Sequence, residues 1–294
     1  MPQTLPIRPA FWNVPVWAEI GIYVVGLLAA VLCIAGVIRA IRIRNKGTSP
    51  LTSSGPDTSW RIKHLLAESF GQKRVMQGAS GKAHFALFWG FLLLFMGTAT
   101  ATLDWDIGHY VFGEQFLKGN IYLAYKLVLD CAGLAAVISL CYGLGRRYLW
   151  HDAKVAENPE RFTILIASLL FIILSGFLVE ALRLAAMRPA WAVFSPVGYA
   201  LSLLFRGMTE ESLRTIHSFV WIIHGLAALT FVAAIPLTYY AHLFKTPISI
   251  YFQKREAPGA LPKIDHIEEQ ETFGISSFDQ FTRLDRIRFD ACTE

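Results

Sequence analysis

Runs of apolar residues alternate with polar segments along the chain, and five of these runs are long enough to cross a bilayer. A membrane's hydrocarbon core needs roughly 20 residues of helix. The runs of that length cover about residues 16–41, 83–103, 121–145, 162–187 and 213–243. Because backbone in lipid must satisfy its own hydrogen bonds, each run predicts a helix. The pattern therefore predicts an all-α integral membrane protein, folded as a five-helix bundle.

The segments outside these runs complete the predicted organisation. Residues 1–15 form a short outer arm, residues 16–255 the five-span membrane domain, and residues 256–294 a polar cytoplasmic linker. WRIKHLLAESFGQKRV, in the first inner loop, predicts an amphipathic helix at the membrane interface. MRPAWAVFSPVGYALSLLFRGMTEES, between the fourth and fifth runs, is too long for a turn. We expect it to pack on the outer membrane surface.

Composition and charge placement support the membrane assignment and add an orientation. The 294 residues are 54% hydrophobic and 17% charged, unlike a soluble domain of this size. If the N-terminus is outside, two of the loops and the C-terminal tail lie on the inner side of the membrane. These three segments hold 20 of the 27 basic residues. Since Lys and Arg concentrate on the cytoplasmic side, the expected topology is N-out, C-in. The first run continues into RAIRIRNK and is read as a retained span rather than a signal peptide.

Four of the eight histidines lie inside predicted spans, where an ionisable side chain is expensive and usually functional. His224 and His242 are 18 residues apart. That spacing is five helical turns, which predicts one shared face with the rings about 27 Å apart. His217 falls two turns before His224 on the same face. His84 begins the second span at the depth where His242 ends the fifth.

Opposed imidazoles at one depth on neighbouring helices are what a bis-histidine b-type haem requires. The spacing therefore favours a b-type haem at the depth that His84 and His242 share, while His224 lies on the same face as His242. Two alternatives remain open, in which the span histidines bond to backbone carbonyls or face the headgroups. Zinc fits less well, because these ligands are spread too far along the axis to converge on one ion.

Two pairs of opposite charges lie within the spans. Lys126 and Asp130 are four residues apart, and Glu180 and Arg183 are three apart, so each pair lies within ion-pair reach on one helix face. The functional interpretation is a quinone pocket in the outer half. There Glu180 or Asp130 exchanges protons, and Arg183 or Lys126 holds a haem propionate or a quinone oxygen. The alternative, structural ion pairs that lock helices together, stays open.

HGLAALTFVAAIPLTYYAH followed by LFKTPISIYFQKR resembles the fifth span and exit of the membrane cytochrome b family of the respiratory nitrate reductase gamma subunit. The resemblance implies that His84 and His242 ligate the haem nearer the cytoplasm and that His224 ligates an outer one. That family has a second histidine ten residues after the first in span two, where this chain has Leu94. One haem b is therefore expected. A second haem is possible either as a five-coordinate group on His224 or with a substitute ligand, for which His217 and His109 are candidates.

A closer resemblance, over about residues 15–255, is to heterodisulfide reductase-related proteins, including electron-transfer flavoprotein:menaquinone oxidoreductase-like iron-sulfur proteins. It is carried by GKAHFALFWGF, GNIYLAYKLVLD, SGFLVEALRL and HSFVWIIHGLAAL. In that group cytosolic four-iron clusters follow the membrane domain. The tail FDQFTRLDRIRFDACTE resembles the lead-in to them, although Cys292 alone cannot hold a cluster that needs four thiolates. This chain is expected to be the membrane part of a longer protein, split or truncated, unless Cys292 is simply a terminal cysteine.

The expected function is electron transfer between a membrane quinone and a cytoplasmic iron-sulfur partner. The partner would be a cysteine-rich subunit or a missing C-terminal domain, with an electron-transfer flavoprotein as one source of electrons. The direction of electron flow is open, and the chain is not expected to be a complete enzyme. The resemblance implies a multi-pass location in a bacterial cytoplasmic membrane, with lipid and no nucleic acid as a partner. The competing interpretation is a non-redox transporter or proton pathway that uses the charges within the spans.

Overall fold

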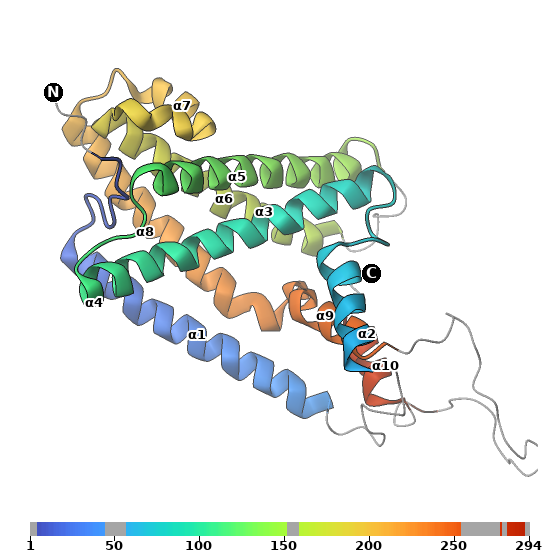
Figure 1. Ribbon diagram of the computed structural model, residues 1–294. Helices are drawn as coiled ribbons and strands as arrows, with labels where there is room; N and C mark the ends of the chain where they lie inside the picture. The colour runs from blue at the N-terminus through green and yellow to red at the C-terminus, as the bar shows by residue number, and fades with distance from the viewer. Residues whose placement is uncertain (1–4, 45–56, 152–158, 254–276, 278–280, 292–294) are drawn as a thin grey trace, which may run out of the picture. The chain divides into compact units, whose positions relative to one another are not determined.

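The computed structural model describes residues 5–44, 57–151, 159–253, 277 and 281–291, and the regular elements among them are helices. By length and composition, five of these helices can cross a membrane, as the apolar runs predict. Figure 1 labels the long ones, which are α1 (Val16–Arg44), α3 (Gly78–Leu103), α5 (Gly119–Tyr148), α6 (Pro159–Met187) and α8 (Glu210–Ala234). The chain is therefore a multi-pass membrane protein.

Shorter helical elements connect the long ones. Before α3 lie α2 (Thr58–Leu65) and η1 (Leu66–Phe70), and after it lie η2 (Asp104–His109) and α4 (Tyr110–Phe112). Between α6 and α8 lie η4 (Ala190–Phe194), α7 (Pro196–Ser202) and η5 (Leu203–Phe205). After α8 come η6 (Ile235–Leu237), η7 (Tyr239–Ala241), α9 (His242–Tyr251) and α10 (Arg283–Ala291).

The chain divides into two compact units. The first unit comprises Met1–Leu28 and Val75–Phe231, and the second comprises Ala29–Arg74 and Val232–Glu294.

In the first unit, α3 and α5 lie side by side and antiparallel (Figure 1), and small residues allow the close approach. A Cβ atom added at Gly97 would lie 2.5 Å from a methyl carbon of Leu129, and one at Gly90 would lie 2.8 Å from the carbonyl oxygen of Ala132. The Tyr125 hydroxyl donates to the carbonyl oxygen of Gly97 at 2.9 Å. Glycine and alanine at such positions let helix backbones meet where lipid offers no hydrophobic driving force.

The N-terminal arm ties two other segments of the first unit together. The Arg8 amide donates to the carbonyl oxygen of Leu117 at 3.2 Å, just before α5 begins. Asn13 Nδ2 donates to Ser218 Oγ at 2.8 Å, and that hydroxyl donates to the Asn13 carbonyl oxygen at 2.6 Å. The arm thus holds the start of α5 and the start of α8.

In the second unit, α2 packs on α9, and α10 packs on α9 as well. Arg61 Nη1 of α2 donates to the carbonyl oxygen of Tyr251 at 2.9 Å, and His64 Nε2 lies 3.0 Å from Gln253 Oε1. Leu284 and Ile287 of α10 are buried. The helix predicted from WRIKHLLAESFGQKRV is confirmed over α2 and η1, while its place at a membrane interface stays a prediction.

The prediction of one continuous fifth helix over residues 213–243 is wrong. Regular α-helix ends at Ala234, and Thr238 is extended with φ −125° and ψ 179°. Pro236 explains the break, because proline lacks an amide hydrogen and its ring clashes with the preceding turn. A Cβ added at Gly36 of α1 would lie 2.5 Å from Pro236 Cγ, so α1 has a glycine where the proline ring approaches. His242 is therefore the first residue of a new helix, α9, and its imidazole does not continue the face of α8.

Candidate functional site

A buried ion network joins α5 to α6 in the first unit. The Glu180 carboxylate accepts from Lys126 Nζ through one oxygen and from Arg183 Nη2 through the other. The side chains of Lys126 and Glu180 are only 5% and 20% exposed. The predicted Glu180 and Arg183 pair is confirmed. The expected pairing of Lys126 with Asp130 is wrong, because α6 supplies a carboxylate that lies closer to the ammonium group than the one on its own helix.

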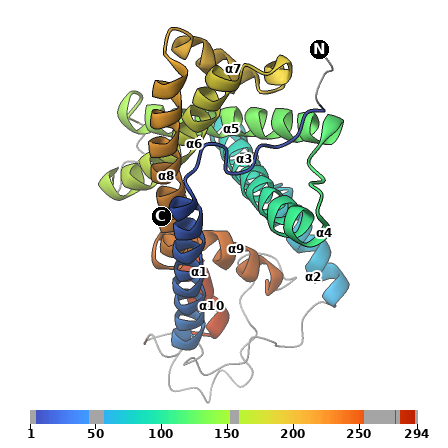
Figure 2. The ribbon, with the colours of Figure 1, turned by 90° about the vertical axis from the view of Figure 1, so that its left-hand side faces the viewer.

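Asp130 binds the start of α7 instead. Its carboxylate oxygens accept from the backbone amides of Val197 at 2.7 Å and Gly198 at 3.1 Å. α7 packs against α5 and α6 (Figure 2), and a Cβ at Gly198 would lie 2.8 Å from Glu180 Cγ. At 1.5 Å per residue, Asp130 lies about 16 Å along the axis from the first residue of α5. The segment between α6 and α8 thus packs on α5 and α6 through α7, while its place on the outer membrane surface stays a prediction.

Aromatic rings surround the ammonium group of Lys126. Its Nζ lies 4.9 Å from the ring centroid of Trp191 and 5.5 Å from that of Tyr122. Such cation–π contacts stabilise a cation that has lost water. Ser195 Oγ donates to Glu180 Oε1 at 3.4 Å, so the segment before α7 also contributes to the network.

Three residues at this network carry a buried polar atom that has no hydrogen-bond partner among the described residues. The atoms are Tyr122 Oη, Arg183 Nε and His217 Nδ1. His217 is only 2% exposed, and its ring meets Trp12 edge-on at 4.7 Å. The charge of Arg183 acts on both Tyr122 and His217. Because buried polar groups are normally satisfied, these atoms indicate a place for a water molecule or a ligand oxygen.

Hydrogen bonds assign the tautomers of His242 and His224. His242 Nδ1 lies 2.7 Å from the carbonyl oxygen of Tyr239, which can only accept, so Nδ1 carries the hydrogen. His224 Nδ1 lies 3.0 Å from Ser175 Oγ, whose own hydrogen is donated to the carbonyl oxygen of Ile172 at 3.0 Å. The hydroxyl therefore accepts from His224 Nδ1. In the neutral form of each ring, Nε2 then keeps its lone pair.

The other candidate ligands lie apart from the ion network. His84 is exposed near the start of α3, in the first unit, whereas His242 belongs to the second, so their pairing at one haem stays a prediction. His109 is exposed and stacks on Trp105 with ring centroids 4.3 Å apart. Within the described ranges, no three His, Cys, Asp or Glu side chains group together to hold a metal ion.

The cysteines form no cluster among the described residues. Cys33, Cys131 and Cys141 are free thiols. Cys292 lies outside the described residues, and so does most of the predicted linker 256–294.

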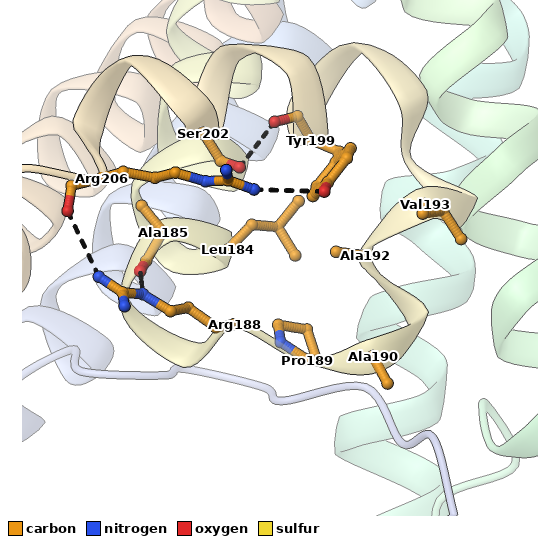
Figure 3. Close-up of a pocket in the computed structure, with 10 residues that line it drawn as sticks. All are labelled: Leu184, Ala185, Arg188, Pro189, Ala190, Ala192, Val193, Tyr199, Ser202 and Arg206. Carbon is orange, nitrogen blue, oxygen red and sulfur yellow. Dashed lines mark hydrogen bonds between the residues drawn. The ribbon is translucent and has the colours of Figure 1, made fainter.

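A pocket of about 430 Å³ opens beside the ends of α6 and α7 (Figure 3). Its polar lining consists of Arg188, Tyr199, Ser202 and Arg206, and Leu184 is among its apolar residues.

Sequence reasoning missed Trp191, Ser195, the two amides of α7 and the polar residues of this pocket. Ser195 followed by Pro196 is a recognisable helix start, since proline is favoured in the first turn. That signal could have placed α7. Nothing in the sequence indicates that its amides meet Asp130, because that contact depends on how α7 folds back.

Comparisons with known proteins give two relatives. The chain is 28% identical over 242 residues to "EtfAB:quinone oxidoreductase" of Syntrophomonas wolfei, covering 79% of this chain and 33% of the relative. It is 25% identical over 241 residues to "Probable iron-sulfur-binding oxidoreductase FadF" of Bacillus subtilis, covering 80% and 33%. The chain thus spans about one third of the length of these relatives. No family model and no solved structure matches it. The chain is thus similar to one protein named as a quinone oxidoreductase and to one named as a probable iron-sulfur-binding oxidoreductase.

Proposed function

We propose that this chain is the haem b-carrying membrane domain of a quinone-linked oxidoreductase, passing electrons between a membrane quinone and a cytoplasmic iron-sulfur partner. The relatives support the general part of this proposal, because their names refer to a quinone oxidoreductase and to iron-sulfur binding. The matched region includes most of this chain, and the five apolar helices fit a membrane quinone as substrate. Both relatives are much longer, so a partner or further domain is part of the proposal.

The tautomers of His242 and His224 are the observation that carries the haem assignment. A ligating histidine normally donates its other ring N–H to a carbonyl, a carboxylate or water, which fixes the ring and raises its basicity. His242 donates to the backbone of Tyr239 and His224 donates to Ser175, so each presents Nε2 as a ligand atom. In this proposal His84 and His242 hold one haem, and His224 remains the candidate for a second. Haem supplies one-electron transfer when bound.

The surroundings of His224 also fit a positioned ligand. A Cβ added at Gly176 of α6 would lie 3.2 Å from His224 Cε1, so the ring occupies the space that the glycine leaves. His217 does not share this arrangement, because its Nδ1 has no partner among the described residues. We therefore assign His217 to the quinone site and not to haem iron.

The quinone site that we propose is the ion network of α5 and α6. The atoms Arg183 Nε, Tyr122 Oη and His217 Nδ1 supply donors that a quinone oxygen could accept from. Arg183 is favoured over Lys126 for this role, because Lys126 Nζ bonds to Glu180 and faces two aromatic rings. Glu180 and Asp130 both stay candidates for proton exchange, because the oxygens of each are already engaged, those of Glu180 by Lys126 and Arg183 and those of Asp130 by two backbone amides.

Optical spectroscopy of the purified chain, expressed with ample haem, tests the proposal. Reduction with dithionite should give a b-type alpha band. His84→Ala and His242→Ala should each remove the same haem, and His224→Ala should change the spectrum only if a second haem is bound. His151→Asn is the control, because His151 is exposed with φ 48°, a conformation that asparagine tolerates. An unchanged band in His84→Ala or His242→Ala would refute the ligand pair.

A transporter or proton pathway is the second candidate, and the buried charges of Lys126, Glu180 and Arg183 favour it. Ionisable residues within spans often mark such pathways. The same reduced spectrum separates the two functions, because a transporter or proton pathway without haem would give no b-type alpha band.

A further inference from the structure

The pocket in Figure 3 lies in the first unit, where α6 ends and the chain turns toward α7. Arg188 follows α6 with φ 46°, the left-handed conformation that often terminates helices. Its amide donates to the carbonyl oxygen of Leu184 at 2.9 Å, and its Nε donates to that of Ala185 at 3.2 Å. This turn brings the guanidinium group of Arg188 to the pocket.

Two arginines line this pocket and no carboxylate does. The lining contains no acidic residue, and neither Arg188 nor Arg206 forms an ion pair with any described residue. Arg188 Nη2 donates to the Arg206 carbonyl oxygen at 3.4 Å, and Arg206 Nη2 donates to Tyr199 Oη at 3.3 Å. A guanidinium has five N–H groups. Arg188 Nη1, and both Nε and Nη1 of Arg206, therefore keep donors for an anion.

The rest of the pocket and its flank are apolar. Figure 3 shows the two arginine side chains on one side of the pocket, and Ala190 and Val193 on the other. Val193, in the lining, is 59% exposed. Leu204, two residues before the lining residue Arg206, is 76% exposed. A phosphate group with attached acyl chains matches this combination of cations and exposed apolar side chains. A free phosphate ion would use only the cations.

The predicted topology supports the same ligand. With the N-terminus outside, the basic residues expected on the outer side are Arg8, Lys118, Arg188, Arg206 and Arg214. Two of these five, Arg188 and Arg206, line this one pocket. The pocket lies at the end of α6, where a spanning helix meets the headgroup region. Arginine pairs readily with phosphate through its planar fork of donors.

We propose that Arg188 and Arg206 bind the phosphate group of an anionic phospholipid, with Tyr199 and Ser202 as further polar groups in the same pocket. This site is separate from the proposed haem and quinone functions. Its role would be to hold one lipid at the junction of α6 and α7.

Native mass spectrometry of the full chain in mild detergent, titrated with phosphatidylglycerol, tests the proposal. The double variant Arg188→Gln/Arg206→Gln should lower the affinity for the first phosphatidylglycerol molecule by about tenfold or more, because it removes both charged donors to the phosphate. Arg214→Gln is the matched control, because Arg214 pairs with Glu210 at 2.8 Å and is not part of the pocket. It should bind phosphatidylglycerol as the unmodified chain does.

Two further comparisons separate loss of the site from loss of the fold and separate lipid from free phosphate. Arg206→Lys retains the charge and should bind more phosphatidylglycerol than Arg206→Gln, while circular dichroism checks that each variant is folded. Equal affinity of the double variant and the Arg214→Gln control would overturn the proposal. Displacement of the lipid by an equal concentration of inorganic phosphate would also overturn it, because the site would then be one for free phosphate.

Discussion

At the scale of single residues, Glu180 is the centre of the buried network. Its carboxylate accepts from Lys126 and Arg183, and Ser195 also donates to it. Removing one partner of a buried ion pair is more harmful than removing both, because it leaves an uncompensated charge. Glu180 faces two cations, so its loss affects both.

Glu180→Gln should therefore lower the free energy of unfolding by about 3 kcal/mol or more. Glu210→Gln is the control, because its partner Arg214 is 44% exposed and exposed pairs contribute about 1 kcal/mol at most. The measurement is thermal or denaturant unfolding of both variants in the same detergent. If Glu180→Gln is as stable as Glu210→Gln, the ion network does not hold α5 to α6.

The sequence predicts part of this network and not the rest. Glu180 and Arg183 are three residues apart on one helix, so their pairing follows from helix geometry alone. Lys126 has Asp130 at an equally suitable spacing on α5, yet it pairs with Glu180 of α6. Which carboxylate lies nearer to the ammonium group of Lys126 depends on how α5 and α6 pack, and a local sequence pattern does not predict that packing.

At the scale of elements, α7 shows how a short helix completes the site. Its first amides satisfy Asp130, and Gly198 lets its backbone approach Glu180. The break after α8 has a comparable local cause in Pro236. Hydropathy does not reveal this break, because IPL is as apolar as the helix before it. The long helices follow from length and apolar character, whereas α7 and the break depend on individual residues.

Gly198→Ala should be destabilising by about 1–3 kcal/mol, because the new methyl group would lie 2.8 Å from Glu180 Cγ. The carboxylate cannot move away freely, since Lys126 and Arg183 hold it. Gly207→Ala is the matched control, as a Cβ there would meet nothing within 4 Å. Unfolding in detergent compares the two variants. Equal stability of Gly198→Ala and Gly207→Ala would mean that α7 does not pack closely against Glu180.

At the scale of the whole molecule, the positions of charged residues predict an orientation that the helices alone do not. Five apolar helices establish only that the chain can cross a membrane several times. The concentration of 20 of the 27 basic residues on one predicted side predicts which compartment each loop faces. The proposed electron transfer depends on this assignment, because an iron-sulfur partner must meet the cytoplasmic side.

Cysteine labelling of intact cells tests the N-out, C-in topology. In a chain whose native cysteines are replaced by serine, Glu114→Cys lies in the exposed loop before α5, which is predicted to be outside. It should react with a membrane-impermeant maleimide in intact cells. Thr58→Cys, exposed at the start of α2 and predicted to be inside, should react only after permeabilisation. The opposite pattern would place the basic loops outside, and a cytoplasmic partner could then not exchange electrons at the end where His84 and His242 are expected to lie.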